Sequence, residues 1–450
     1  MRKGRIPAAL TIAGSDSSGG AGVEADLKTF SALNVYGTCA ITAVTAQNTM
    51  KVNSIYPLPV KVIIDQIKAV LEDIPIENVK VGMVYTSDAM VSISKILREK
   101  QLRFVLDPVM RAGSGAALIE EKAKRTLIEK LIPYAFLVTP NRMEAEEIAN
   151  TKIKNAKDMI EAAKIISDLG AESVLIKGGH IKDTTAIDIL YFNEEVHQYR
   201  RSRLNRKFHG TGCTLSSAIT AFLARGYGLL EAVEKSEDFM SKNLKFSEEI
   251  GKGRVPVNQF VQLYIDSDRW RTLQNVSEAV ERIERLHSVA PYIPEVGMQV
   301  AMAIKYGEGL SDVAAVEGRI FNVKGSPKPM GRVWFGASKH LANVVLTAKK
   351  YDDSMRAAVN LHYNPELLKA FRKAGFTISS FSRAFEPVEV KLREGATLSW
   401  GVEEAIKAFG DVPDVIYDLG EVGKEPMIRV LGQTAIEVIN KIEAALKKLG

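Results

Sequence analysis

Two glycines and a cysteine stand where a helix is expected to begin, in the stretch His209-Gly210-Thr211-Gly212-Cys213-Thr214. Apolar residues recur with helical spacing directly after it, from Leu215 to Leu223. The start of a helix leaves backbone N–H groups unpaired and carries a partial positive charge. Because glycines let such a backbone approach a ligand closely, Gly210, Thr211 and Gly212 are predicted to form an anion-binding hole.

Cys213 falls in the first turn of this predicted helix. A thiol in that place typically has a lowered pKa, so Cys213 is a candidate base or nucleophile. The alternative is an N-capped helix that buries an unreactive cysteine. Since Gly-x-Gly patterns are common, the stretch alone does not decide between these two interpretations.

Five predicted strands run into polar or glycine-rich segments at their carboxyl ends. In a sheet of parallel strands these ends meet at one edge, where ligands bind. The strands alternate with predicted helices along the first half of the chain, which indicates an α/β fold with a mostly parallel sheet and helices on both faces. The five segments are Gly14 to Gly22, Gln47-Asn48, Asp107, Thr139 to Asn141, and Lys177-Gly178-Gly179.

The composition is typical of a globular protein with more than one domain. A length of 450 residues predicts two or three domains, and 46% hydrophobic with 25% charged residues is ordinary for folded chains. The net charge of +6 is small for this length, which favours anionic small molecules over nucleic acid as ligands. The 2 cysteines cannot build a disulfide framework, and no apolar run has the length of a signal or membrane segment, so we expect a cytoplasmic protein.

The first half contains, in this order, TIAGSDSSGGAGVEADLKTF, TAVTAQNT, VGMV, LDPVM, TPNRMEAE, LIKGGH, HGTGCTLSSAI and GKGRVP. On these segments, residues 1–258 resemble the hydroxymethylpyrimidine kinases and hydroxymethylpyrimidine phosphate kinases of thiamine synthesis. That family belongs to the ribokinase-like superfamily, whose fold is the mostly parallel α/β sheet expected above.

This resemblance implies two ATP-dependent reactions. The first phosphorylates the alcohol of 4-amino-5-hydroxymethyl-2-methylpyrimidine, and the second phosphorylates the resulting monophosphate. Cys213 would be the base that acts on the alcohol, or would only position the alcohol, while Gly210, Thr211 and Gly212 would hold the transferred phosphate. Most ribokinase-like sugar kinases carry Asp in place of Cys213, whereas the pyrimidine kinases carry Cys.

The same resemblance implies residues for ATP and for a Mg²⁺ ion. Lys177, Thr139 and Asn141 would bind the nucleotide, and Glu144 with Asp107 would order Mg²⁺ and its waters. The structural alternatives are a solvated lysine at 177, and a helix-capping arrangement for the pair Asn141 and Glu144.

Four residues would form the pyrimidine pocket, according to the resemblance. Gln47 would recognise the ring, because its amide offers both a donor and an acceptor to an aminopyrimidine edge. Gly14, Asp26 and Met83 would complete the pocket, with Met83 packed against the ring. For Met83 an ordinary place in the core is the alternative.

The second half has different motifs and does not repeat the first. It contains GRIFNV, FGASKHLANVV, MRAAVNLHY and DLGEVGKEPMIRV. Residues 262–450 resemble the thiamine-phosphate synthase domain that archaea and some bacteria fuse behind the pyrimidine kinase. We therefore expect a kinase domain over 1–258, followed by a separate, smaller α/β domain over 262–450.

That resemblance implies a reaction that joins hydroxymethylpyrimidine diphosphate to hydroxyethylthiazole phosphate and releases pyrophosphate. The anionic leaving group requires cationic side chains and usually Mg²⁺. Arg319 and His340 are the best candidates, with His340 at a predicted helix start. The alternative for His340 is a capping or core histidine. Secondary candidates are Lys339, Arg356 and Asn360. Asp418 and Glu425 could bind a cation or could be ordinary turn residues.

Two rival interpretations remain open. A pyridoxal-type kinase also phosphorylates a hydroxymethyl group on a ring, although Gln47 and the glycine-rich segment after residue 13 favour the pyrimidine. The second half could bind thiamine phosphate as a sensor without catalysis. In every case we expect small-molecule substrates, no nucleic acid or membrane partner, and a homodimer or higher homo-oligomer.

Overall fold

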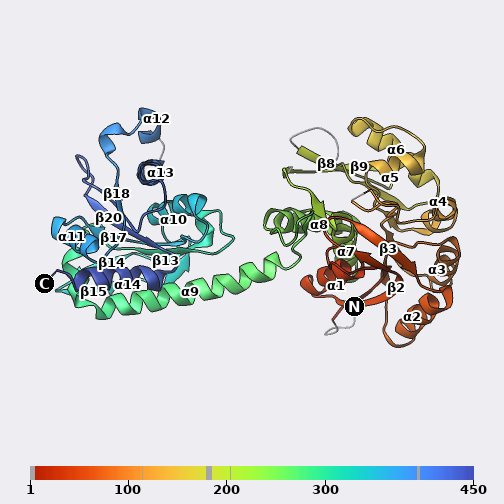
Figure 1. Ribbon diagram of the computed structural model, residues 1–450, viewed down its shortest axis with the longest axis horizontal. Coiled ribbons are helices and arrows are strands. Elements are labelled where there is room, and N and C mark those ends of the chain that lie inside the picture. The colour runs from red at the N-terminus through yellow and green to blue at the C-terminus, as the bar shows by residue number, and fades with distance from the viewer. Residues whose placement is uncertain (1–5, 114, 179–184, 203, 393–395, 450) are drawn as a thin grey trace. The chain divides into compact units, whose positions relative to one another are not determined.

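The computed structural model describes residues 6–113, 115–178, 185–202, 204–392 and 396–449. The chain forms two compact units, Met1–Leu263 and Tyr264–Gly450. Each unit contains a sheet with helices packed against it (Figure 1). Within the described part of the chain, every helix is too short or too polar to cross a membrane.

A mostly parallel sheet forms the centre of the first unit. Its strands lie in the order β3-β2-β1-β4-β5-β6-β7-β8-β9. Neighbours from β2 through β7 in this order are parallel. β3 runs antiparallel to β2, β8 to β7, and β9 to β8. The bounds are β1 (Ala8–Asp16), β2 (Tyr36–Gln47), β3 (Val52–Pro57), β4 (Asn78–Val81), β5 (Arg103–Leu106), β6 (Leu137–Val138), β7 (Ser173–Ile176), β8 (Thr185–Phe192) and β9 (Glu195–Ser202).

Helices cover both faces of this sheet, because successive strand residues point to opposite sides. Phe104 and Leu106 face one core cluster, while Val105 between them faces another. The first cluster includes α2 (Val60–Asp73), α3 (Ser87–Glu99), α4 (Glu121–Thr126), α5 (Arg142–Ala149) and α6 (Ala156–Asp168). The second includes α1 (Gly22–Ala32), α7 (Thr211–Ala224) and α8 (Leu229–Lys245). The predicted fold class of the first half is confirmed.

The second unit is a smaller α/β body with a different sheet. Its strands lie in the order β16-β13-β12-β17-β20-β19-β18, and only β18 and β19 are parallel neighbours. The bounds are β12 (Val300–Ala303), β13 (Val313–Val316), β16 (Val333–Phe335), β17 (Ala357–His362), β18 (Ile378–Ser380), β19 (Val415–Asp418) and β20 (Met427–Gly432), with a separate hairpin of β14 (Ile320–Val323) and β15 (Ser326–Pro329).

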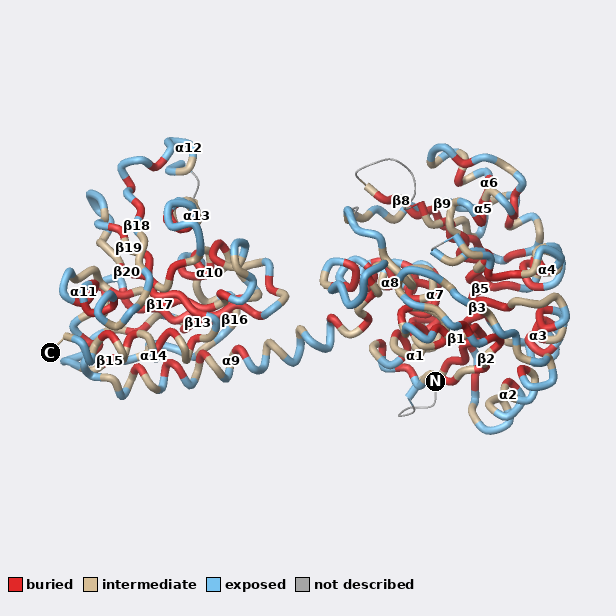
Figure 2. Tube along the Cα trace, viewed as in Figure 1, coloured by how far each residue is buried: buried red, intermediate tan, exposed pale blue. Residues whose placement is uncertain are grey.

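Alternation along the strands again separates two core clusters in this unit. Val300 and Met302 face α9 (Val261–Arg285), α11 (Pro365–Lys373) and α14 (Ala435–Leu446). Ala301 and Ala303 face α10 (His340–Tyr351) and α13 (Ala396–Phe409). Figure 2 shows the buried residues concentrated in the strands and on the helix faces that cover them. The short helix α12 (Val388–Lys391) lies outside these clusters.

Candidate functional site

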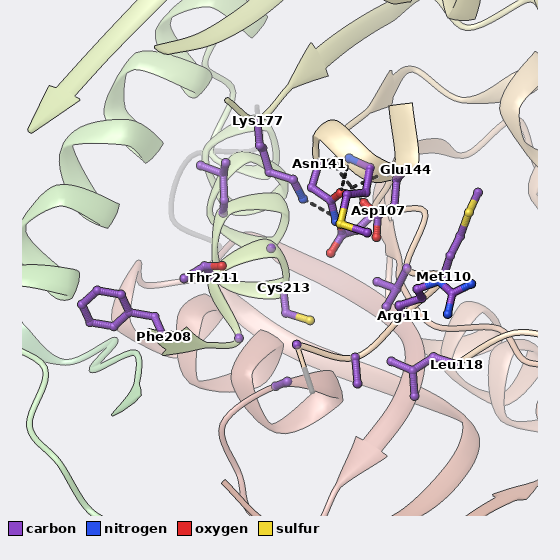
Figure 3. Close-up of a pocket in the computed structure, with 18 of the residues that line it drawn as sticks. Asp107, Met110, Arg111, Leu118, Asn141, Glu144, Lys177, Phe208, Thr211 and Cys213 are labelled. Carbon is purple, nitrogen blue, oxygen red and sulfur yellow. Dashed lines mark hydrogen bonds and ion pairs between the residues drawn. The ribbon is translucent and has the colours of Figure 1, made fainter. Parts of the chain in front are cut away.

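A cavity of about 1170 Å³ lies at the carboxyl ends of the parallel strands of the first unit. The topology explains its place, because polar segments that follow neighbouring parallel strands meet at this edge. Figure 3 shows Lys177, Asn141, Glu144 and Asp107 close together, with Cys213 projecting from the first turn of α7. The predicted residues that line the cavity are Gln47, Asp107, Asn141, Glu144, Lys177, Gly210, Thr211, Gly212 and Cys213.

The start of α7 is an open backbone cradle. Gly210 is its N-cap residue with φ +79°, and no side chain of the described residues caps the helix. A Cβ at Gly210 would lie only 1.8 Å from the carbonyl oxygen of Gly20, so this position requires glycine. A Cβ at Gly212 would lie 3.1 Å from both Asp107 Oδ2 and Lys177 Nζ. The first N–H groups of α7 therefore open beside the charged groups, as an anion hole requires.

The Cys213 thiol lies at this helix start, but its ionisation differs from the prediction. Burial raises the pKa of the Cys213 thiol to about 12, and the nearby Lys80 ammonium offsets only part of the rise. A hydrogen bond from the Gly22 N–H also favours the thiolate, without reversing the balance. The expectation of a lowered pKa was therefore wrong, because loss of solvent outweighs the helix terminus here.

Lys177 and Asp107 form an ion pair on the cavity wall. Their Nζ and Oδ1 atoms are 2.9 Å apart, and Asp107 is almost fully buried. Burial disfavours the charged ammonium, but Asp107 and Glu144 hold the pKa of Lys177 above its ordinary value. Thr139 is fully buried behind this pair, with its hydroxyl 3.4 Å from Asp107 Oδ1, and is not part of the cavity lining. Its position supports Asp107 instead of a direct nucleotide contact.

Asn141 and Glu144 form a capping box at the start of α5. The Asn141 side chain accepts hydrogen bonds from the N–H groups of Met143 and Glu144, and Glu144 Oε2 accepts one from the Asn141 N–H. Burial raises the pKa of the Glu144 carboxyl to about 7; Lys177 opposes the rise and the Asp107 carboxylate adds to it. The capping interpretation is thus confirmed for the free protein, and it holds Glu144 in place at the cavity.

The two carboxylates fit a magnesium ion by their chemistry. Asp107 and Glu144 supply hard oxygen donors, and Lys177 leaves their shared buried charge only partly compensated. Among the described residues, no group of three or more His, Cys, Asp or Glu side chains has the arrangement of a metal site. A site completed by phosphate oxygens and water needs only one or two protein carboxylates, which is how Mg²⁺ usually binds.

The four predicted pyrimidine residues separate into two layers. Gln47 lines the cavity, whereas Gly14, Asp26 and Met83 do not. A Cβ at Gly14 would lie 2.9 Å from Met83 Sδ, so glycine leaves room for the methionine. Met83 is buried in a small cluster with Ala43 and Leu118, which is the core alternative considered for it.

Asp26 does not occupy the position expected for a substrate ligand. It is fully buried, its Oδ2 lies 2.8 Å from Lys80 Nζ, and it accepts hydrogen bonds from the hydroxyls of Thr11 (2.6 Å) and Ser217 (2.7 Å). Both carboxylate oxygens of Asp26 are thus occupied by these three donors. Asp26 therefore balances a buried ammonium behind Cys213, a role invisible without the partner, Lys80, which lies 54 residues away in the sequence.

A second pair that the sequence analysis missed reaches the cavity directly. His209 lines it, and His209 Nε2 lies 2.8 Å from Asp16 Oδ2 and 3.4 Å from Gln47 Nε2. Both residues stand inside segments that drew attention for their glycines, at the end of β1 and just before α7. The signal was the histidine beside Gly210, but its partner lies 193 residues away.

In the second unit, Arg319 lies in a turn and His340 lies at the start of a helix. Arg319 lies in the turn after β13 with φ +68°, and its guanidinium donates to the carbonyl oxygen of Val296. Among the described residues it has no carboxylate partner. His340 is exposed and begins α10, as predicted. No hydrogen bond or ion pair links these two described side chains.

Most secondary candidates of this unit have partners within the fold. Arg356 NH1 lies 2.9 Å from Asp268 Oδ2, and Asn360 accepts a 2.7 Å hydrogen bond from the Gln299 N–H. Lys339 is exposed at the N-cap of α10. The two acidic candidates are used as well: Asp418 lies 2.7 Å from both Arg383 Nε and Arg429 NH1, and Glu425 Oε1 lies 2.7 Å from His362 Nδ1. The expectation that Asp418 could hold a cation is therefore contradicted.

Comparison with known proteins matches each of the two units to a protein family. Residues 16–258 match the family model described as phosphomethylpyrimidine kinase. The chain belongs to the phosphomethylpyrimidine kinase family. Residues 275–444 match a second family model, which is described as thiamine-phosphate synthase ThiN.

Individual relatives cover either the whole chain or the kinase unit. The bifunctional thiamine biosynthesis protein ThiDN of Methanocaldococcus jannaschii is 36% identical over 97% of this chain and 98% of its own length. A hydroxymethylpyrimidine/phosphomethylpyrimidine kinase of Staphylococcus aureus is 43% identical over 57% of this chain and 94% of its own. The structure of the pyridoxal kinase from Staphylococcus aureus with AMP-PCP and pyridoxal is 33% identical, with a TM-score of 0.54, over 58% of this chain and 95% of that one.

Proposed function

We propose that this chain makes thiamine phosphate by three successive reactions. The first unit transfers phosphoryl groups from ATP to hydroxymethylpyrimidine and then to its monophosphate, and the second unit joins the diphosphate to hydroxyethylthiazole phosphate. One observation supports the kinase part most strongly. An open helix start, an ion-paired lysine, two buried carboxylates and a thiol converge on one cavity.

In the first reaction the hydroxymethyl oxygen attacks the γ-phosphorus of ATP, and the bond from that phosphorus to the β-bridging oxygen breaks to release ADP. The N–H groups at Gly210, Thr211 and Gly212 hold the transferred phosphoryl oxygens, and Lys177 balances their charge. Because such a transition state is loose, the alcohol proton need not leave before the attack; it passes to an oxygen of the transferred phosphoryl group or to solvent as the new O–P bond forms.

We assign Cys213 the positioning of the alcohol, in place of proton abstraction. A thiol whose pKa is about 12 is neutral at physiological pH, and its sulfur is then too weak a base to take the alcohol proton. The S–H group can still orient the hydroxymethyl oxygen beside the anion hole.

A magnesium ion bound at this site would neutralise phosphate charge. Glu144 and Asp107 would hold it through their carboxylate oxygens, while Asn141 keeps Glu144 oriented through the capping box. The capping box and the Lys177 pair already fix both carboxylates in the free protein, so the residues need little rearrangement.

For the second unit we propose pyrophosphate displacement supported by Arg319 and His340. Arg319 has no described carboxylate partner, so its charge is available to a diphosphate. His340 would contact a phosphate oxygen from the start of α10. The rival function, thiamine-phosphate sensing, predicts binding of thiamine phosphate without formation of it.

The kinase proposal is tested by product analysis with two competing acceptors. The full chain with ATP and Mg²⁺ should convert hydroxymethylpyrimidine to its mono- and diphosphate, measured by mass spectrometry and ADP release. Pyridoxal is the second acceptor, because the kinase unit also resembles a pyridoxal kinase. A higher kcat/KM for pyridoxal would replace the pyrimidine by pyridoxal as the substrate. Lys177→Ala is the control that should abolish either activity.

A further inference from the structure

Asp16 is the fixed end of a hydrogen-bonded chain that reaches the cavity. Its carboxylate accepts hydrogen bonds from the N–H groups of Ser18 (2.8 Å), Gly20 (3.1 Å) and Ala21 (2.8 Å), and from the Ser18 hydroxyl (2.7 Å). Burial works against ionisation, but hydrogen bonds from His209 and Ser18 outweigh it and hold the pKa of Asp16 below its ordinary value. Asp16 is therefore an ionised carboxylate, which accepts hydrogen bonds and donates none.

His209 must consequently donate to Asp16. The distance from His209 Nε2 to Asp16 Oδ2 is 2.8 Å, and a carboxylate without a proton requires N–H on that nitrogen. The imidazole packs directly against Gly20, since a Cβ at Gly20 would lie 2.4 Å from His209 Cδ2. Its tautomer and its place are thus both determined by the loop that follows β1.

Gln47 stands next in this chain, with its main chain also anchored. The Ser17 hydroxyl donates to the Gln47 carbonyl oxygen (2.7 Å) and accepts from the Gln47 N–H (2.9 Å). The Gln47 Nε2 position lies 3.4 Å from His209 Nε2. His209 Nε2 carries a single hydrogen, which it donates to Asp16, so this nitrogen cannot accept a hydrogen bond from the Gln47 NH₂ group. A half-turn of the amide, which leaves its shape unchanged, places Oε1 beside this N–H, where it shares the hydrogen with Asp16, and turns Nε2 to the cavity.

We propose that Asp16 and His209 lock the Gln47 amide in this orientation and thereby make the site select a 4-amino ring over its 4-oxo counterpart. The proposal rests on the proposed role of Gln47 as the reader of the pyrimidine. In the locked orientation, Nε2 donates to the bare ring nitrogen, and Oε1 accepts from the adjacent amino group. A 4-oxo ring presents the reverse pattern, N–H and carbonyl, and would require the amide to turn its NH₂ group toward His209.

The test compares two substrates in the full chain: 4-amino-5-hydroxymethyl-2-methylpyrimidine and its 4-oxo analogue. The wild type should prefer the amino ring by about 10²-fold in kcat/KM, as expected for a site whose polar groups are left unpaired by the wrong edge. Two variants free the Gln47 amide to turn: His209→Ala, and His209→Phe, whose ring has no N–H. In both variants the preference should fall below about tenfold.

Each alternative gives a different result. If the His209 variants slow both substrates by the same factor, His209 has only a structural role and the proposal is overturned. A wild type that phosphorylates both rings equally well overturns it without any variant. Gln47→Ala tests the recognition of the ring separately from the orientation of the amide. If the preference for the amino ring is unchanged in that variant, Gln47 does not read the ring. A preference lost in Gln47→Ala but kept in both His209 variants contradicts the lock alone.

Discussion

At the scale of single residues, Cys213 carries the sharpest prediction. Cys213→Ala should lower kcat for the first phosphorylation by about 10²-fold, since the alcohol loses its positioning contact. For the wild type, kcat should stay flat between pH 7 and 9, because a thiol with a pKa of about 12 does not titrate there. A tenfold rise of kcat for each pH unit would show that the thiolate is the base after all.

Glu144 predicts a pH dependence of magnesium binding. The folded protein holds its carboxyl proton up to a pKa of about 7, and only the ionised form can bind the cation. The KM for Mg²⁺ should therefore fall about tenfold from pH 6 to pH 8, as the arithmetic of one competing proton requires. Glu144→Gln is the control, because titration of the nucleotide is common to both proteins. Equal pH profiles for the two would contradict the assignment.

The same scale shows which residues a sequence can and cannot assign. Asp107, Glu144, Lys177 and Gln47 could be predicted, because parallel strands bring their carboxyl ends to one edge. Asp26 could not, since its ion pair with Lys80 joins a helix to a strand 54 residues away. The prediction of a lowered pKa for Cys213 was also wrong, because the direction of the shift depends on burial that no local motif reveals.

At the scale of elements, the start of α7 depends on one backbone conformation. Gly210→Ala would place a Cβ 1.8 Å from the Gly20 carbonyl oxygen at φ +79°, so both the β1 loop and the anion hole must shift. We expect a loss of kinase kcat/KM above about 10²-fold and a lower melting temperature. The matched control is Gly228→Ala at the N-cap of α8, where φ is −68° and no atom of the described residues lies within 4 Å of the added Cβ. Similar losses in both variants would refute the special role of Gly210.

Periodicity predicted whether a segment is a helix or a strand better than it predicted how the strands pair. The alternation of strands and helices predicts the parallel sheet of the first unit, and β1 and α7 begin within a few residues of the expected positions. The mostly antiparallel sheet of the second unit was not predicted, because short apolar strands such as Val300–Ala303 carry no mark of their neighbours' direction.

At the scale of the whole molecule, the two activities should be separable. The core clusters of the first unit end at Val257, and those of the second begin at Val276 among their buried residues. Gln259 is buried, and its Nε2 donates to Thr214 Oγ1 at 3.1 Å, so the first unit extends past the predicted boundary at 258. A fragment of residues 1–263 should keep full kinase activity and melt at a higher temperature than 1–258. Loss of kinase activity in both fragments would show that the units depend on each other.

The central claim, that one chain carries out all three steps, is tested most directly by one reaction mixture. The purified chain receives hydroxymethylpyrimidine, hydroxyethylthiazole phosphate, ATP and Mg²⁺, and the products are quantified by mass spectrometry with separate assays for ADP and pyrophosphate. The account predicts two ADP and one pyrophosphate for each thiamine phosphate formed. It also predicts that Arg319→Ala and His340→Ala accumulate the pyrimidine diphosphate. Absence of thiamine phosphate from the wild type, with the diphosphate accumulating in its place, would contradict the claim.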